Sequence, residues 1–198
     1  VPTGPDYIRE QVRHIRSQTD RPFGVGFITH RIPLFPENFE AALEEEVPVI
    51  LFSFADPRPW LSRARESGAK TICQVQTVEA ARVAVAAGAD VLAAQGNESG
   101  GHTGSMNLLP FLVRLIDEFP DIPVIAAGGI ASGRSLAAVL AAGAEGAWVG
   151  TAFVATLENN EVPDIHKDRI VKSDGEDTVL TEVSDIITTK IRNSPSWP

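Results

Sequence analysis

The chain contains a single cysteine in 198 residues, and this scarcity excludes two kinds of site. Cys73 cannot form an internal disulfide, and no group of cysteines is present to bind a metal ion. It lies inside an apolar run, whereas a nucleophilic thiol needs exposure and positively charged neighbours, so we expect a buried and unreactive thiol. The four histidines are scattered without metal-ligand spacing, and we expect no metal site.

Positive charge and long apolar runs are also scarce. The 17 lysines and arginines stand against 26 acidic residues, and a formal net charge of -9 disfavours binding to nucleic acid or to an anionic membrane. No apolar run is long enough to cross a bilayer, and the first five residues, VPTGP, lack a basic segment followed by an apolar one. We therefore expect a soluble, cytoplasmic protein that acts on a small molecule, with no nucleic acid and no membrane as partner.

Strand and helix patterns alternate along most of the chain, whose length suits one domain. Three helix-to-strand joints share a Gly-Ala pair at residues 68–69, 88–89 and 143–144, where a glycine can end a helix in the left-handed conformation. Apolar strands separated by helices and short joints indicate a parallel sheet covered by helices. After an opening helix that ends before Asp20, we expect strands over residues 23–28, 48–54, 71–75, 90–95, 123–127 and 146–150, and helices over 36–46, 57–67, 78–87, 109–119 and 132–142.

About six such strands fit either an open doubly wound sheet or a TIM-type (β/α)8 barrel without its first two strand-helix units. The loops after the last two strands favour the barrel. Gly128-Gly129 and Gly150-Thr151 place backbone N–H groups at helix starts, and barrels of this type bind phosphate on those two loops. We predict one incomplete barrel domain over residues 1–198.

The pattern weakens after Thr151. We expect a short helix over residues 152–157, a polar break over 158–163, a helix over 166–172 and a strand-like run over 178–183. Residues 186–191 are ambiguous, and residues 193–198 should be loose. The sequence thus predicts an irregular C-terminal tail from about residue 158.

The stretch that points most directly to chemistry is glycine-rich, AAQGNESGGHTG at residues 93–104. Glycines such as Gly100 and Gly101 let a backbone approach a flat or anionic ligand closely. His102 adds an imidazole, which can take or give a proton near neutral pH. A solvated loop histidine is the alternative interpretation.

In a barrel, this loop and the two phosphate-binding loops share the C-terminal face. Flavin mononucleotide (FMN) fits that arrangement, with its phosphate on Gly129 and the Gly150-Thr151 loop. Its ring would lie toward the preceding strand ends, where the Gln95 amide can donate and accept hydrogen bonds.

Two segments, AQGNESGGHTG at residues 94–104 and PVIAAGGIASGRSLAAVLAAGAEGAWVGTAF at residues 123–153, resemble the nitronate monooxygenase family, formerly called 2-nitropropane dioxygenases. The similarity extends from about Ile8 to Val183. It implies an FMN-dependent barrel in which His102 is the active-site histidine. The positions that match the family's flavin-binding residues, together with the adjoining Gly101 and Gly128, are Gln95, Gly100, Gly129, Trp148, Val149, Gly150 and Thr151.

The resemblance implies oxidation of an alkyl nitronate with O2 to a carbonyl compound and nitrite, and His102 can serve as the base where a neutral nitroalkane is the substrate. Close relatives are FMN-dependent NAD(P)H reductases of enoyl-acyl-carrier-protein or quinone, and the same motif suits them. A non-catalytic remnant that cannot hold flavin is an alternative of another class.

Two departures from the family pattern bear on these expectations. Trp148-Val149 stands where Gln-Met is common, so a side-chain contact to the flavin is in doubt, and Trp148 could instead pack against the helices. A barrel without its first two units also exposes unpaired strand edges, which favours a homo-oligomer over a monomer.

Overall fold

The structure is a computed structural model that describes residues 4–181 and 183. The chain divides into two compact units, Val1–Gly150 and Thr151–Pro198, and each is described by itself. Residues 1–3 lie outside the described residues. They belong to the first five residues, in which no basic segment followed by an apolar one was found.

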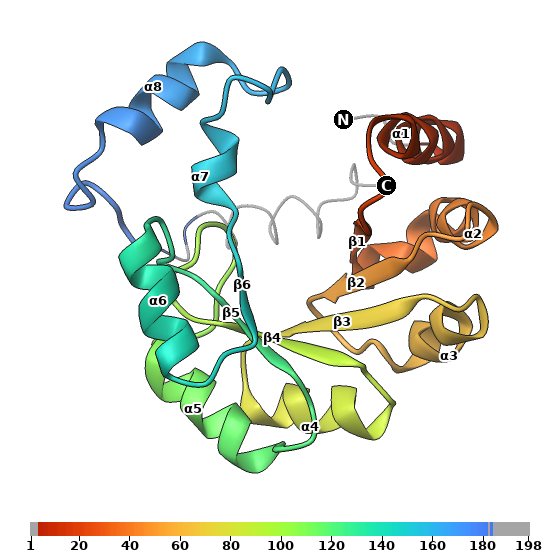
Figure 1. Ribbon diagram of the computed structural model, residues 1–198, viewed down its shortest axis with the longest axis horizontal. Helices are drawn as coiled ribbons and strands as arrows, with labels where there is room; N and C mark the ends of the chain where they lie inside the picture. The colour runs from red at the N-terminus through yellow and green to blue at the C-terminus, as the bar shows by residue number, and fades with distance from the viewer. Residues whose placement is uncertain (1–3, 182, 184–198) are drawn as a thin grey trace. The chain divides into compact units, whose positions relative to one another are not determined.

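The first unit contains a parallel sheet of six strands that lie side by side in chain order (Figure 1). A doubly wound sheet reverses its strand order at a switch point, whereas the strands of a TIM-type barrel follow one another in sequence. The observed order therefore confirms the predicted barrel type, here with six strands. The strands are β1 (Gly24–Ile28), β2 (Val49–Ser53), β3 (Lys70–Val75), β4 (Val91–Gln95), β5 (Val124–Ala127) and β6 (Gly146–Trp148).

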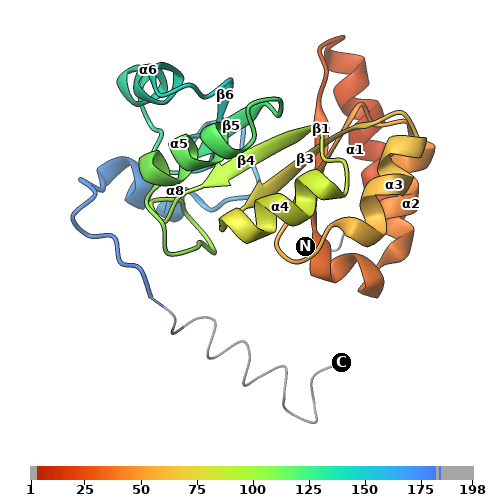
Figure 2. The ribbon, with the colours of Figure 1, turned by 90° about the horizontal axis from the view of Figure 1, so that it is seen from below.

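Helices connect successive strands and lie along one face of the sheet (Figures 1 and 2). The expected helices of this unit are confirmed, but the 3-10 helix that follows β1 was not predicted. The helices are α1 (Pro5–Gln18), η1 (Thr29–Leu34), α2 (Pro36–Glu44), α3 (Arg58–Glu66), α4 (Val78–Ala86), α5 (Leu108–Glu118) and α6 (Gly133–Ala141). Among the described residues, no helix is both long and apolar enough to cross a membrane.

The repeated Gly-Ala joints end α3, α4 and α6 in the same way. Gly68, Gly88 and Gly143 have φ values of +86°, +90° and +99°. After α4, the Gly88 N–H donates to the Val85 carbonyl at 2.9 Å and the Ala89 N–H donates to the Ala84 carbonyl at 3.0 Å. This is the Schellman arrangement, in which glycine tolerates the left-handed conformation that turns the chain into the next strand.

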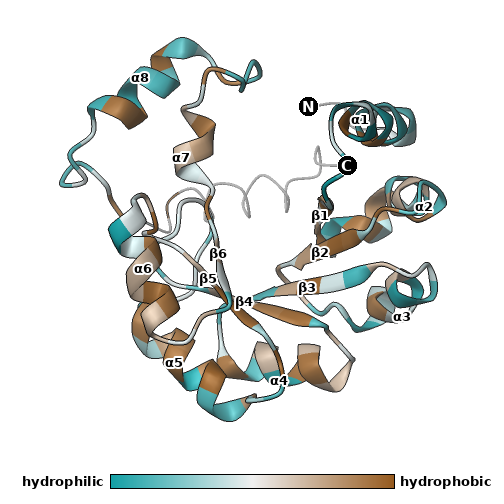
Figure 3. Cartoon of the chain, viewed as in Figure 1, coloured by the Kyte–Doolittle hydropathy of each residue, from teal (hydrophilic) through white to brown (hydrophobic). Residues whose placement is uncertain are grey.

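Side chains alternate between the two faces of the sheet, and the core lies between the sheet and the helices. Ile50 and Phe52 of β2 are buried with Phe39 of α2 and Leu61 of α3 in one apolar cluster. Figure 3 shows β2 and β4 as largely hydrophobic, whereas α1 is largely hydrophilic. Full burial of each large apolar side chain stabilises the fold by roughly 1.5–3 kcal/mol. The other face of the sheet is left to carry polar groups at the strand ends.

The second unit contains α7 (Thr151–Val154) and α8 (Asp164–Lys172). The predicted strand-like run at 178–183 is wrong for residues 178–181, which belong to no strand. Val179 and Leu180 are 80% and 67% exposed, so no strand of the described part of the chain covers their side chains. The predictions for residues 186–191 and 193–198 lie outside the described residues.

Candidate functional site

A row of side chains crosses the sheet where β3 to β6 end. Strand register pairs Gln95 with Ala127 and Ala127 with Trp148, and the side chain of Gln76, which directly follows β3, contacts that of Gln95. Ala126 lies in the core on the helix side of the sheet. Because neighbouring residues in a strand point to opposite faces, the row lies on the face that the helices do not cover.

The strand register determines the face of the sheet toward which Trp148 and Val149, the two residues that depart from the family pattern, point. Trp148 shares the face of Gln95 instead of packing against the helices, and it is half-buried. Val149 packs against the core cluster, so it has only its backbone to offer on the other side.

The glycine-rich loop between β4 and α5 is fixed to its surroundings at several points. The Gly96 N–H and the Ser99 hydroxyl both donate to the Ala127 carbonyl, at 2.9 and 3.1 Å. The Asn97 N–H donates to the Met106 carbonyl at 2.8 Å and closes the loop. The loop is therefore held against the end of β5.

His102 is held by its backbone and exposed through its side chain. The Gln95 Nε2 donates to the His102 carbonyl at 3.0 Å, and the Gln76 Nε2 donates to the same oxygen at 3.3 Å. The imidazole meets the Phe54 ring edge-on, with the ring centroids 5.9 Å apart. An imidazole that is exposed while its backbone is fixed is suited to exchange protons with a small molecule at this face.

The loop between β5 and α6 contains the second group of predicted site residues. Gly128 and Gly129 have φ values of +118° and +64°, in the region that favours glycine. A Cβ on Gly128 would lie 3.0 Å from the Ser99 nitrogen, so glycine lets the two loops approach each other closely.

At the start of α6, Ser132 and Ser135 form a capping box, in which each hydroxyl accepts a backbone N–H of the other residue. Gly150 has open space around its Cα, because a Cβ there would meet nothing within 4 Å. Thr151 begins α7 in the second unit. The first unit thus brings together Gln95, Gly128, Gly129, Trp148 and the His102 loop at one edge of the sheet.

Sequence reasoning missed four residues that shape this edge: Phe54, Gln76, Glu98 and Ser99. The signal for Gln76 was present, since it directly follows a strand that ends beside β4. Its meaning depends on the pairing of β3 with β4, which is known only once the sheet is formed.

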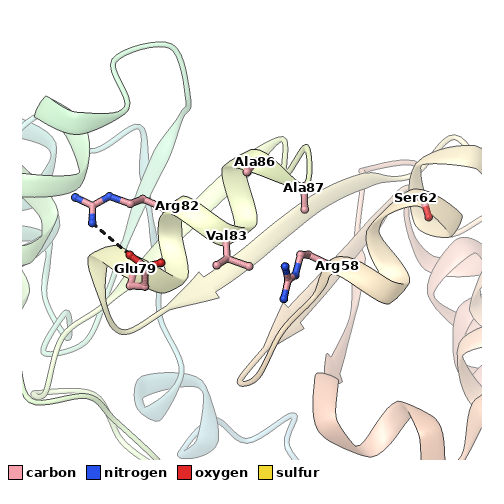
Figure 4. Close-up of a pocket in the computed structure, with 7 residues that line it drawn as sticks. All are labelled: Arg58, Ser62, Glu79, Arg82, Val83, Ala86 and Ala87. Atoms are coloured by element: carbon pink, nitrogen blue, oxygen red, sulfur yellow. Dashed lines mark hydrogen bonds and ion pairs between the residues drawn. The ribbon is translucent and has the colours of Figure 1, made fainter.

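A separate groove of about 520 Å³ lies between α3 and α4 (Figure 4). Its Arg82 pairs with Glu79 at 3.3 Å and with Glu118 at 2.6 Å. Its Arg58 pairs with Asp56, and the hydrogen bonds from Arg58 lower the pKa of that carboxyl. Both guanidinium groups are therefore already neutralised by carboxylates, and the groove is not prepared for an anion.

A sequence profile of the family described as nitronate monooxygenase matches residues 2–193. The chain belongs to the nitronate monooxygenase family. A probable nitronate monooxygenase from Staphylococcus aureus is 37% identical in an alignment of 158 residues, gaps included, that covers 75% of this chain and 44% of the relative.

Other relatives carry different names. A (3aS,4S,5R,7aS)-5-hydroxy-7a-methyl-1-oxo-octahydro-1H-indene-4-carboxyl-CoA dehydrogenase from Mycobacterium tuberculosis is 35% identical over 89% of this chain and 50% of its own length. The chain thus spans about half the length of the curated relatives that it matches.

Solved structures show the same fold. FabK from Thermotoga maritima is 39% identical and superposes with a TM-score of 0.85 over 91% of this chain and 57% of its own. Nitroalkane oxidase from Streptomyces ansochromogenes is 33% identical, with a TM-score of 0.73 over 84% of this chain and 60% of its own.

Proposed function

We propose that this chain belongs to an FMN-dependent oxidoreductase of the nitronate monooxygenase type, which oxidises alkyl nitronates with O2 to carbonyl compounds and nitrite. The observation that supports this most is the convergence of Gln95, Trp148, the Gly128-Gly129 pair and the His102 loop on the helix-free face of the sheet. Ligands of parallel α/β proteins bind at the carboxyl ends of the strands, where these groups lie.

The residues present fit a flavin with a phosphate tail. For the phosphate we propose the backbone of Gly128, Gly129 and Gly150, because residues without a Cβ allow close approach to an anion and Gly150 is open. Bound FMN would supply the electron transfer. For its ring we propose contacts from Gln95 and Trp148, with the backbone of Val149, Gly100 and Gly101 beside it.

In this proposal His102 transfers protons and takes no part in electron transfer. A neutral nitroalkane must lose the proton on the carbon next to its nitro group to become a nitronate, and the exposed His102 ring can accept that proton. A preformed nitronate has already lost it. The requirement for His102 should therefore depend on which of the two forms is supplied.

A second candidate is an NAD(P)H-dependent flavin reductase that acts on an enoyl thioester or a quinone. The similarity to FabK favours this candidate. The sequence identity and the TM-score are both higher with FabK than with the nitroalkane oxidase. The two candidates differ in the electron donor. Without oxygen, NADH should bleach the bound flavin of a reductase, whereas an alkyl nitronate should bleach that of a nitronate monooxygenase.

The experiment that tests the proposal is an absorbance spectrum of the purified chain before and after incubation with FMN and desalting. Retained flavin bands that an alkyl nitronate bleaches anaerobically, with nitrite released on admission of O2, are expected. Bleaching by NADH alone would replace the proposal with the reductase. Protein that stays colourless after addition of FMN would identify this chain as unable to hold flavin, and the non-catalytic alternative would stand.

A further inference from the structure

We propose that Gln76 is a positioning residue, which fixes the orientation of the Gln95 amide and so determines the hydrogen-bonding character of the ligand site. The inference concerns a contact between side chains in this structure. Its consequence for FMN rests on the function proposed above.

The orientation of both amides follows from the group that they share. The His102 carbonyl oxygen only accepts hydrogen bonds, so Gln95 and Gln76 must both turn an N–H toward it, at 3.0 and 3.3 Å. The second N–H of Gln76 donates to the Gln95 Oε1 at 2.8 Å. Both donors of the Gln76 amide are thereby used.

This arrangement prevents the Gln95 amide from flipping. A flip would turn the Gln95 oxygen toward the His102 carbonyl, and it would turn the Gln95 nitrogen toward the Gln76 nitrogen. Both contacts would become repulsive, and a buried polar group that loses its hydrogen-bond partner destabilises the arrangement. Gln95 is 6% exposed, so water offers little compensation.

A locked Gln95 offers a ligand less than a free amide does. Its oxygen is engaged by Gln76, and one of its two N–H groups is engaged by His102. The positions that remain are one N–H donor and the second lone pair of Oε1, and the lock fixes the direction of each. A ligand acceptor must then face the remaining N–H and a ligand donor the remaining lone pair, so the amide cannot exchange these two roles as the expectation from sequence allowed.

The backbone around Gln76 is anchored without its side chain. Val75 before it lies in β3, and the Thr77 hydroxyl after it caps α4 by accepting the Ala80 N–H at 3.1 Å. The end of the glycine-rich loop packs against this backbone, since a Cβ on Gly104 would lie 2.9 Å from the Gln76 carbonyl oxygen. Side-chain substitutions at Gln76 should therefore leave the fold in place.

The test compares Gln76→Glu, which keeps the shape and loses both donors, with Gln74→Met as a control at a neighbouring position; Gln76→Met is the variant that Gln74→Met matches in side chain. Gln74 precedes Gln76 by two residues on the same strand face, but its side chain accepts a hydrogen bond from Ser53 at 2.8 Å. The first measurement is the proton NMR signal of the His102 ring without ligand, assigned with His102→Gln. Phe54 lies edge-on to that ring, so its ring current reports small movements of His102.

Gln76→Glu should shift and broaden the His102 signal, because a carboxylate would face the Gln95 and His102 oxygens. Gln74→Met should leave the signal in place. An unchanged signal in Gln76→Glu would overturn the inference, since a residue that only fills space would be replaced well by one of equal shape. If Gln76→Glu does not fold, Gln76→Met provides the same comparison.

The second measurement is the dissociation constant of FMN in a double-mutant cycle with Gln95→Met. Gln76→Met and Gln95→Met should each weaken binding about tenfold, and the double variant no more than about tenfold, because Gln76 acts through Gln95. An additive loss of about 100-fold would show independent action and contradict the inference. Wild-type protein that binds no FMN would refute the proposed function, while the NMR comparison would still decide the role of Gln76.

Discussion

The carboxylate of Glu98 accepts the backbone N–H of Leu108 through both of its oxygens, at 2.9 and 3.1 Å. Leu108 is the first residue of α5, and the Asn107 side chain at the N-cap position makes no capping hydrogen bond within the described part of the chain. A residue ten positions earlier therefore caps the helix. The carboxylate also places a negative charge at the positive end of the helix dipole.

We expect Glu98→Ala to lower the free energy of unfolding by about 0.5–2 kcal/mol, as the loss of an N-cap does. Glu98→Gln, which keeps an acceptor and loses the charge, should lower it less. Urea unfolding at neutral pH measures both effects. Glu10→Ala, on the exposed surface of α1, is the control, and equal losses in Glu10→Ala and Glu98→Ala would contradict the capping role.

Under the function proposed above, His102→Gln should separate the two substrate forms. Because proton abstraction by a positioned base contributes about 10²–10⁴-fold, turnover of a neutral nitroalkane should fall by that factor, and turnover of the preformed nitronate should fall far less. Steady-state nitrite release with each substrate measures the difference. His14→Gln, an exposed change on α1, should alter neither rate. Equal losses with both substrates would assign His102 to binding instead of proton transfer.

Asp90 should make stability depend on pH in the acid range. Partial burial acts to raise its pKa, but hydrogen bonds from Lys70 Nζ at 2.9 Å and from the Thr71 backbone and hydroxyl at 2.9 and 2.8 Å leave the pKa lowered overall. A lowered folded-state pKa stabilises the fold above the ordinary carboxyl pKa of 3.8, and this contribution is lost as the pH falls through the folded-state value.

Asp90→Asn should accordingly reduce the free energy of unfolding by about 1–3 kcal/mol at pH 7, and the gap from the wild type should shrink below about pH 4. Urea titrations at several pH values measure this gap. Asp117→Asn, at an exposed position of α5, should show neither the loss nor the pH dependence. A gap that stays constant down to pH 3 would refute the role of the Asp90 charge.

Cys73 should be inert in the folded protein. Burial, with a smaller effect from the Asp90 charge, raises the pKa of its thiol to about 12, so almost no thiolate forms at pH 8. A chromogenic disulfide reagent at pH 8 should release no colour until urea unfolds the chain, and then one equivalent. Rapid reaction without urea would show that β3 opens to solvent.

The sequence predicts the periodic parts of the fold well, for a physical reason. Each strand and α-helix up to residue 150 has a local sequence signal, such as the apolar run of β2 or the Gly88 that turns the chain out of α4. The 3-10 segment η1 has none, because its Pro33 and irregular apolar spacing match neither helix nor strand periodicity. The run at 178–181 failed in the opposite sense, because its apolar residues form no strand in the described part of the chain.

The candidate site was predictable only as a set of loops. Gly128, Gly129 and His102 stand out in the sequence because loops rich in glycine and an imidazole are unusual for plain connectors. The partnership of Gln76 with Gln95 depends on strand pairing, and the face of Trp148 depends on its register with Ala127. Such relations arise between distant segments, and no local pattern encodes them.

The opposite orientations of Trp148 and Val149 make the end of β6 sensitive to length. One residue inserted between Gly146 and Trp148 would reverse the faces of the two side chains. The indole would then point into the core, and the valine would point to the face that the helices do not cover. Two inserted residues would restore the original sides. The side chain that this strand presents on the helix-free face therefore depends on whether an odd or an even number of residues precedes it, as much as on the choice of amino acid.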